Sequence, residues 1–246
     1  MNAVNTIEQL RTLRLQGMAI ALERQLSQPA FSGASFEQRI QMLVDAENSH
    51  RDTQRFKRIL KNARLKVQAL PEDLDYRPGR GLEKSVVAGL LGCAWIWKQQ
   101  NLLITGPAGT GKTFLSCALG LEAARHGLTV AYRRTARLLE EMAIAHEDGS
   151  IGKMRSQLMK MQLLILDDFG LNQMTSRGRA DLLELLDDRV GASSTIVLGQ
   201  MPVKEWHGFI NDPALADAIL DRLVHSSHKI ALKGESMRKL KAESGQ

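Results

Sequence analysis

The stretch Gly106-Pro-Ala-Gly-Thr-Gly-Lys-Thr113 decides how this chain folds. It matches G-x-x-x-x-G-K-[ST], the pattern of the phosphate-binding loop. The apolar residues 102–105 before it predict a buried strand, and residues 114–125 after it predict a helix. In that order, the glycines let successive main-chain N–H groups point at phosphate oxygens, and the start of the helix adds a partial positive charge. The motif therefore predicts a nucleotide-binding α/β domain.

The loop itself supplies most of the expected nucleotide contacts. Lys112 is expected to bridge the β- and γ-phosphates, and the Thr113 hydroxyl is expected to be a ligand of Mg²⁺. An ordinary glycine-rich turn before a helix is the alternative, but all eight positions of the pattern match in the right context. ATP and Mg²⁺ are therefore the expected cofactors. The expected nucleotide-binding residues are Gly106, Pro107, Ala108, Gly109, Thr110, Gly111, Lys112, Thr113 and Phe114.

A second apolar run ends in two acids. Residues 163–166 have the short, continuous hydrophobicity of a central parallel strand, and Asp167 and Asp168 follow directly. This resembles the Walker B pattern, in which the first acid holds Mg²⁺ and the second polarises the attacking water. Asp168 is one methylene shorter than the commoner Glu, which shortens its reach to that water. The alternative is a pair that merely caps a turn, but its place downstream of a phosphate loop favours Walker B.

Composition limits the class of protein. The chain has 246 residues, of which 43% are apolar and 24% charged, as in ordinary soluble globular proteins. The longest uncharged apolar stretch, residues 86–97, is too short to span a bilayer. The only cysteines, Cys93 and Cys117, lie in apolar helical patterns, which favours packed thiols in a reduced compartment. We therefore expect a cytoplasmic protein with no membrane partner.

The net charge of +6 is concentrated in one segment. Residues 51–66 contain seven basic side chains and a single acid. On a helix several of them share one face. A face that carries charge of one sign favours contact with the phosphates of double-stranded DNA. The alternative is a merely solvated face, but such a face usually mixes charges of both signs. Arg133 and Arg134 follow a predicted strand, where DNA contact and plain solvation are equal alternatives. The other candidate DNA-binding residues are Arg51, Arg55, Lys57, Arg58 and Lys61.

The pattern along the chain predicts two parts. Residues 1–70 form a small helical domain for DNA or partner binding, in which Ser35 caps a helix that starts at Phe36. Residues 71–81 form a linker, and residues 82–246 alternate helices with strands, which predicts a parallel sheet flanked by helices. The predicted strands are 101–105, 129–132, 162–166, 195–198 and 229–232. The predicted helices of this second part are 82–99, 114–126, 179–190, 213–224 and a terminal helix, with helical segments over about 135–160.

Residues beyond the two acids resemble elements of AAA+ ATPases. Gln200 follows the predicted strand 195–198, like the polar sensor of that superfamily, although Gly199 stands where a small hydroxyl residue is expected. The segment around Arg222 resembles the one that carries the arginine finger, and Arg238 resembles the second sensor arginine. An arginine paired with Asp221 or Asp217, and a basic tail around Arg238, are the respective alternatives.

Nearly the whole chain resembles the IstB-like ATPases, helper proteins of bacterial insertion sequences in the AAA+ branch that contains DnaC-type helicase loaders. In the N-terminal half, residues 13–23 and 62–65 carry this resemblance. It implies an AAA+ P-loop NTPase fold behind a small all-α domain. The catalytic residues that it implies are Lys112, Asp168, Gln200, Arg222 and Arg238.

The same resemblance implies a function. An ATP-dependent, DNA-binding ATPase would assemble with copies of itself through the ATP site, with Arg222 supplied by a neighbouring subunit, and would help a cognate transposase to select its target. Such a protein would work in the bacterial cytoplasm and on the nucleoid when it is bound to DNA. A replicative helicase loader and a nucleotide-gated DNA architectural protein with little turnover are the alternatives.

Overall fold

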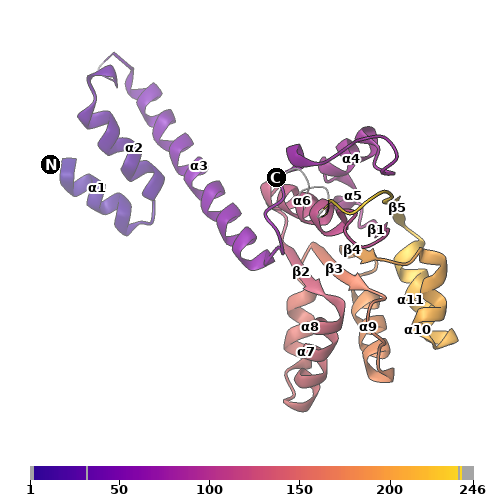
Figure 1. The fold of residues 1–246 in the computed structure, drawn as a ribbon. Helices are drawn as coiled ribbons and strands as arrows, with labels where there is room; N and C mark the ends of the chain where they lie inside the picture. The colour runs from indigo at the N-terminus through magenta and orange to yellow at the C-terminus, as the bar shows by residue number, and fades with distance from the viewer. Residues whose placement is uncertain (1–2, 32, 238, 240–246) are drawn as a thin grey trace. The chain divides into compact units, whose positions relative to one another are not determined.

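The computed structural model of the protein describes residues 3–31, 33–237 and 239. The chain divides into two compact units, Met1–Arg58 and Ile59–Gln246. Figure 1 shows the first unit as helices only and the second as a sheet with helices on both faces. No helix within the described ranges has both the length and the apolar character that crossing a membrane requires.

The first unit consists of packed helices. They are α1 (Ala3–Thr12), α2 (Gln16–Ser27), the 3-10 turn η1 (Pro29–Phe31) and α3 (Phe36–Ala63), which continues into the second unit. The predicted cap at Ser35 is confirmed: Ser35 Oγ accepts from the Gln38 N–H at 3.3 Å, and Gln38 Oε1 accepts from the Ser35 N–H at 2.9 Å. The α2 helix lies so close to α3 that a Cβ on Gly17 would be 2.4 Å from the Ala46 carbonyl oxygen.

The second unit is built on a five-stranded sheet. The strands are β1 (Asn101–Thr105), β2 (Val130–Arg134), β3 (Leu163–Phe169), β4 (Ser194–Gly199) and β5 (Ser227–Ala231). Their order is β2-β3-β4-β1-β5, and every neighbouring pair is parallel. The predicted parallel α/β fold is confirmed. The predicted end of the strand at residue 166 was wrong. The strand β3 continues through Asp167 and Asp168 to Phe169, so both acids belong to the strand tip.

Helices cover both faces of this sheet. The side chain of Ile165 faces α6, where it lies 3.0 Å from the position of a Cβ on Gly120. Its neighbours Leu164 and Leu166 face the opposite side and pack in the core formed with α7, α9 and α11. The helices of the second unit are α4 (Lys84–Leu91), α5 (Ala94–Trp97), α6 (Lys112–Arg125), α7 (Thr135–Glu147), α8 (Ile151–Met159), α9 (Ser176–Arg189), α10 (Trp206–Ile210) and α11 (Pro213–Val224), with 3-10 turns η2 (Pro71–Asp73) and η3 (Val203–Glu205).

One predicted helix is divided in the structure, and one observed helix was missed. The helix predicted over 82–99 is two helices, because Cys93 has a φ of +57° and turns the chain between α4 and α5. The helical segments predicted over about 135–160 are α7 and α8, separated at Gly149 with a φ of +75°. The helix α10 was not predicted at all. The predicted terminal helix lies almost entirely outside the described residues.

The segment predicted as a linker belongs to the second unit. The units divide between Arg58 and Ile59, before the boundary predicted at residue 70. The reason is burial: Ala63 and Ala69 are almost fully buried, and Leu65 packs within 3.1 Å of the position of a Cβ on Gly120. Hydrophobic contact therefore fixes the end of α3 and the following chain to α6. The assignment of functions to the two parts stays a prediction.

Candidate nucleotide site

The phosphate-loop motif connects the buried end of β1 to the start of α6. Its glycines Gly106, Gly109 and Gly111 have φ values of +145°, +82° and +96°, which other residues rarely adopt. Space is also limited, because a Cβ on Gly106 would lie 2.3 Å from the Leu232 carbonyl oxygen. The glycines of the motif are therefore needed both for the turn and for the close approach of the chain that follows β5.

Lys112 and Thr113 open α6 at the base of this loop. The Lys112 ammonium donates to the carbonyl oxygens of Gly106 and Pro107 at 2.6 and 2.8 Å, so the cation is held against the loop. The Thr113 hydroxyl donates to Asp167 Oδ2 at 2.8 Å. The structure thus brings together the two motifs, which lie far apart in the sequence.

The donor set around Asp167 fits Mg²⁺. Its carboxylate, 1% exposed, lies beside the Thr113 hydroxyl, and Mg²⁺ prefers such oxygen ligands while keeping water and phosphate in its remaining positions. In the described part of the chain, no cluster of three or more His, Cys, Asp or Glu residues could hold a metal. A carboxylate beside a hydroxyl suits a metal that also takes ligands from nucleotide phosphates.

Asp167 is fixed by residues that sequence analysis missed. The Tyr132 hydroxyl, on the neighbouring strand β2, donates to Asp167 Oδ2 at 2.5 Å, and the Thr135 hydroxyl donates to the Asp167 carbonyl oxygen at 3.0 Å. Burial, together with the charge of Asp167, raises the pKa of Tyr132, so this hydroxyl keeps its proton. A tyrosine at the end of an apolar strand next to the acidic strand was the only available signal.

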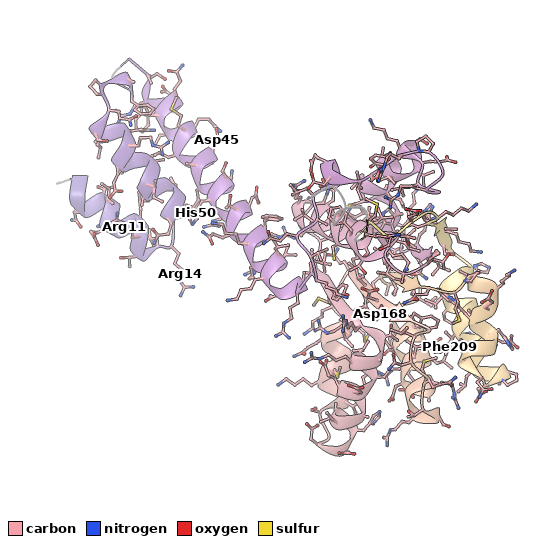
Figure 2. The ribbon with its side chains drawn as sticks, viewed as in Figure 1. Arg11, Arg14, Asp45, His50, Asp168 and Phe209 are labelled. Carbon is pink, nitrogen blue, oxygen red and sulfur yellow. The ribbon has the colours of Figure 1, made fainter. Side chains whose placement is uncertain are left out.

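Asp168 has an unusual backbone conformation. Its φ is +59°, and the register between β3 and β4 shifts between Leu166 and Phe169. Asp168 is the residue labelled near the end of β3 in Figure 2. Its carboxylate is 30% exposed and lies 3.6 Å from the Arg134 guanidinium. The strand irregularity places Asp167 and Asp168 in different surroundings, one buried and one open to solvent.

The phosphate loop and the two acids line one cleft of about 430 Å³. Besides the loop, it is bordered by Asp167, Asp168, Arg134 and Gln200, so Gln200, which follows β4, lies at the same cleft as the two acids. The predicted sensor role of Gln200 stays a prediction.

The segment predicted as a linker also borders the cleft. Arg80 donates to the Thr110 carbonyl oxygen at 2.6 Å and forms an ion pair with Asp75 at 2.7 Å. Hydrogen bonds from Arg77 and Arg80 hold the pKa of Asp75 well below its usual range, so the carboxylate stays charged. Sequence analysis missed this wall because prolines and glycines are equally typical of linkers and of close-fitting loops.

The chain after β5 returns to the phosphate loop. The Met237 N–H donates to the Gly109 carbonyl oxygen at 2.9 Å, and a Cβ on Gly109 would lie 2.2 Å from the Ser236 hydroxyl oxygen. The predicted sensor residue Arg238 lies outside the described residues.

Arg222 is not part of this cleft. It lies on α11, where it pairs with Asp187 at 3.1 Å and with Asp221 at 3.6 Å. The Asn101 side chain, at the start of β1, donates to the Arg222 carbonyl oxygen at 3.0 Å. The phosphate loop follows the other end of β1, about 13 Å away along an extended strand of this length. Arg222 and the loop are therefore at opposite ends of the same strand.

The candidate DNA-binding residues form two groups. Those on α3 are exposed, and Arg51 pairs with Glu47 at 2.7 Å, so the basic stripe is not entirely of one sign. Arg133 and Arg134 end β2; Arg133 is half-buried and Arg134 is exposed. Both groups are therefore accessible to solvent at least in part.

The chain is similar to known proteins over most of its length. The family model described as IstB-like ATP binding protein matches residues 8–244. An insertion sequence ATP-binding protein of Sinorhizobium fredii is 44% identical over 95% of this chain and 96% of its own. The insertion sequence IS1162 ATP-binding protein of Pseudomonas fluorescens is 49% identical over 80% of this chain and 86% of its own. The crystal structure of DnaI, 18% identical, superposes with a TM-score of 0.60 over 72% of this chain and 94% of DnaI.

Proposed function

Because the chain belongs to the IstB-like ATP binding protein family, we propose that it binds ATP with Mg²⁺ in the cleft and hydrolyses it. The observation that supports this most strongly is the hydrogen bond between Thr113 and Asp167, which joins the phosphate loop to the acidic strand tip at 2.8 Å. The relatives from S. fredii and P. fluorescens are themselves named ATP-binding proteins.

Each residue of the cleft has a distinct task in this proposal. The loop N–H groups and Lys112 hold the phosphates, with the lysine exchanging loop carbonyls for phosphate oxygens. Thr113 and Asp167 would hold Mg²⁺, which when bound would neutralise charge on the nucleotide phosphates. Asp168 accepts a proton from a water molecule as that water attacks the γ-phosphorus. The bond from the γ-phosphorus to the β–γ bridging oxygen breaks, and ADP leaves with the electron pair.

Arg222 completes the site from a neighbouring subunit in this proposal. Its distance from its own phosphate loop along β1, and its place beside the surface cavity lined by Asp187 and Asp221, support a contact with another copy of the chain. Such a finger stabilises charge on the transferred phosphoryl group, an effect of roughly 10³- to 10⁵-fold in other phosphoryl-transfer systems. Hydrolysis would then depend on assembly.

The biological role proposed is to bind double-stranded DNA and to help the transposase of an insertion sequence, in the bacterial cytoplasm and on the nucleoid. The names of the relatives support the insertion-sequence context. A helicase loader remains the second candidate, because the crystal structure of the DnaC helicase loader shares the fold with a TM-score of 0.52. Capture of a transposase but not of a replicative helicase would support the first role, and the reverse result would support the second.

ATP turnover tests the proposal directly. We expect the purified protein to bind labelled ATP in the presence of Mg²⁺ and to release phosphate faster when duplex DNA is added. We expect Asp168→Asn to bind ATP but to release phosphate much more slowly. Failure of the wild-type protein to bind ATP would overturn the proposal, whereas binding with negligible turnover on DNA would favour the nucleotide-gated architectural protein.

A further inference from the structure

Arg80 contacts the phosphate loop from outside the motif. Its guanidinium donates through Nη2 to the Thr110 carbonyl oxygen at 2.6 Å. The same nitrogen lies 3.4 Å from the position of a Cβ on Gly111. Arg80 therefore packs against the peptide unit that joins Thr110 to Gly111, on the wall of the nucleotide cleft.

This contact fixes more than one carbonyl group. The Thr110–Gly111 peptide is trans, and a planar trans peptide points its carbonyl oxygen and its N–H in opposite directions. A donor that holds the Thr110 oxygen therefore also directs the Gly111 N–H away from Arg80. Among the described residues no carbonyl oxygen accepts from this N–H. The N–H is thus available to a phosphate oxygen, as successive N–H groups of an anion-binding loop must be.

Two other loop carbonyls depend on the lysine of the motif. Lys112 donates to the Gly106 and Pro107 oxygens at 2.6 and 2.8 Å. In the proposed mechanism the lysine exchanges these oxygens for phosphate, so its hold on the loop ends when the nucleotide binds. Arg80 donates from the cleft wall and keeps its bond to Thr110. The loop therefore needs Arg80 most in the nucleotide-bound protein.

An acid keeps the Arg80 guanidinium in place. Asp75 Oδ2 accepts from Arg80 Nη1 at 2.7 Å while Nη2 reaches Thr110, so one guanidinium bridges the acid and the loop. The side chains of Arg80 and Asp75 are only 12% and 19% exposed, so water and salt screen this pair little. A planar guanidinium serves two acceptors in a fixed geometry, which the ammonium of a lysine does not.

We propose that Arg80 is a positioning residue for nucleotide binding, which fixes the Thr110–Gly111 peptide so that the Gly111 N–H points at a phosphate oxygen. Asp75 holds the guanidinium that does this. The contact is the same before and during phosphoryl transfer, so Arg80 contributes to the affinity for the nucleotide and not to the rate of the bound complex. This inference rests on the proposed ATP site and names a residue outside the motif on which the site depends.

The test compares Arg80→Gln with the wild-type protein in binding of labelled ATP and in phosphate release. One hydrogen bond from a charged donor corresponds to about tenfold in affinity, so the Kd for ATP should rise by about tenfold, and KM with it. The rate at saturating ATP should stay within about twofold of the wild type. An unchanged Kd, or a loss confined to the saturating rate, would overturn the inference.

Inorganic tripolyphosphate shows which part of the nucleotide depends on Arg80. It carries phosphates without a base or sugar, so it competes with labelled ATP through the phosphate loop alone. Arg80→Gln should weaken this competition by about the same factor as it weakens ATP binding. Weaker binding of ATP with unchanged competition by tripolyphosphate would place the effect of Arg80 on the nucleoside and overturn the inference.

Arg77→Gln is the matched control. Arg77 pairs with the same oxygen of Asp75 at 2.7 Å, but it is 61% exposed and does not line the cleft. Its loss should leave the binding of ATP and of tripolyphosphate within about twofold of the wild type. If Arg80→Gln fails to fold, Arg80→Lys tests the same contact. Its ammonium keeps a donor without the bridging fork, so an intermediate affinity is expected, and an affinity equal to that of Arg77→Gln would contradict the inference.

The ATP site and the role of Arg80 can fail separately. If neither the wild-type protein nor Arg77→Gln binds labelled ATP, the proposed function fails. If both bind ATP and Arg80→Gln binds it equally well, the ATP site stands and only the positioning role of Arg80 is overturned.

Discussion

At the scale of single residues, the two neighbouring acids of β3 have different environments because the strand is irregular between them. Asp167 is buried and accepts hydrogen bonds from Thr113 and Tyr132, whereas Asp168 turns into a more open position with a positive φ. A regular strand would also place successive side chains on opposite faces of the sheet. The irregularity instead lets both carboxylates border the same cleft.

Lys112→Ala should nearly abolish ATP binding. Lys112 is the loop residue that brings a positive charge to the phosphates, and the glycine backbone without it offers only N–H groups. Labelled-ATP binding with Mg²⁺ measures the effect, and Lys98→Ala, outside the residues that line the cleft, is the matched control. Unchanged affinity of Lys112→Ala for ATP would contradict the assignment of the phosphate loop.

At the scale of elements, a buried arginine joins α8, α9 and β4. Arg189 is 2% exposed and donates to the carbonyl oxygens of Leu158, Met161 and Ser194 at 2.8, 2.9 and 2.5 Å. A fourth bond runs from Arg189 Nε to the Thr195 hydroxyl oxygen at 3.1 Å. Burial lowers the pKa of Arg189 to about 10, which still leaves it charged at neutral pH.

Arg189→Met should destabilise the protein by roughly 2–5 kcal/mol, because several buried carbonyl groups lose their donor at once. The midpoint of unfolding in urea measures this. Arg155→Met is the control: Arg155 pairs with Asp188 and Glu184 near the surface, where loss of an ion pair costs about 1 kcal/mol or less. Equal midpoints for the two variants would show that the hydrogen bonds of Arg189 contribute no more to stability than the ion pairs of Arg155.

On α3, neutralising Arg51, Arg55 and Arg58 should flatten the salt dependence of DNA binding. Each phosphate contact contributes about 0.9 to the slope of log affinity against log salt, so three lost contacts should reduce it by about 2–3. Fluorescence anisotropy at several salt concentrations measures the slope. Neutralising Arg11 and Arg14 on the same unit, both labelled in Figure 2, is the control. An unaltered slope in the triple variant would move the contact away from α3.

Elements were predictable where their signal is contiguous. The phosphate loop and the acidic run are short patterns with fixed spacing, and the five strands follow from apolar runs between turns. The wall around Arg80 and the support from Tyr132 were not predictable, because they reach the cleft through packing of segments far apart in the chain. The break within the helix predicted over 82–99 was missed for a local reason, because the left-handed turn at Cys93 occurs at a residue that gives no turn signal.

At the scale of the whole molecule, the second unit carries two unlike surfaces. The cleft lies at the carboxyl ends of the strands, whereas Arg222 lies beside the start of β1. If the Arg222 surface of one subunit meets the cleft of the next, the contact joins two different faces. Such a contact generates rings when the rotation closes and helical filaments when it does not. The assembly would therefore be directional, with one ATP site at each junction.

Arg222→Ala should separate binding from turnover in this assembly. The variant should bind ATP about as well as the wild type, because the phosphate loop, Thr113 and Asp167 belong to its own subunit. It should lose most phosphate release and ATP-dependent assembly on DNA, because no finger reaches the neighbouring site. Asp187→Asn, which removes the partner that holds Arg222 at 3.1 Å, should act in the opposite direction and favour assembly.

Mixing Arg222→Ala with Lys112→Ala subunits decides whether the finger crosses between subunits. In a mixed assembly, some junctions combine an intact phosphate loop from one chain with an intact Arg222 from the other, so part of the phosphate release should return. Random mixing at equal amounts makes such a junction one in four, which sets the recovery at about a quarter of the wild-type rate. Mass measurement on DNA shows whether the assemblies are mixed. No recovery in a mixed assembly would place Arg222 in its own chain's chemistry or outside the reaction, since only a residue acting across the junction can restore a site that neither variant forms alone.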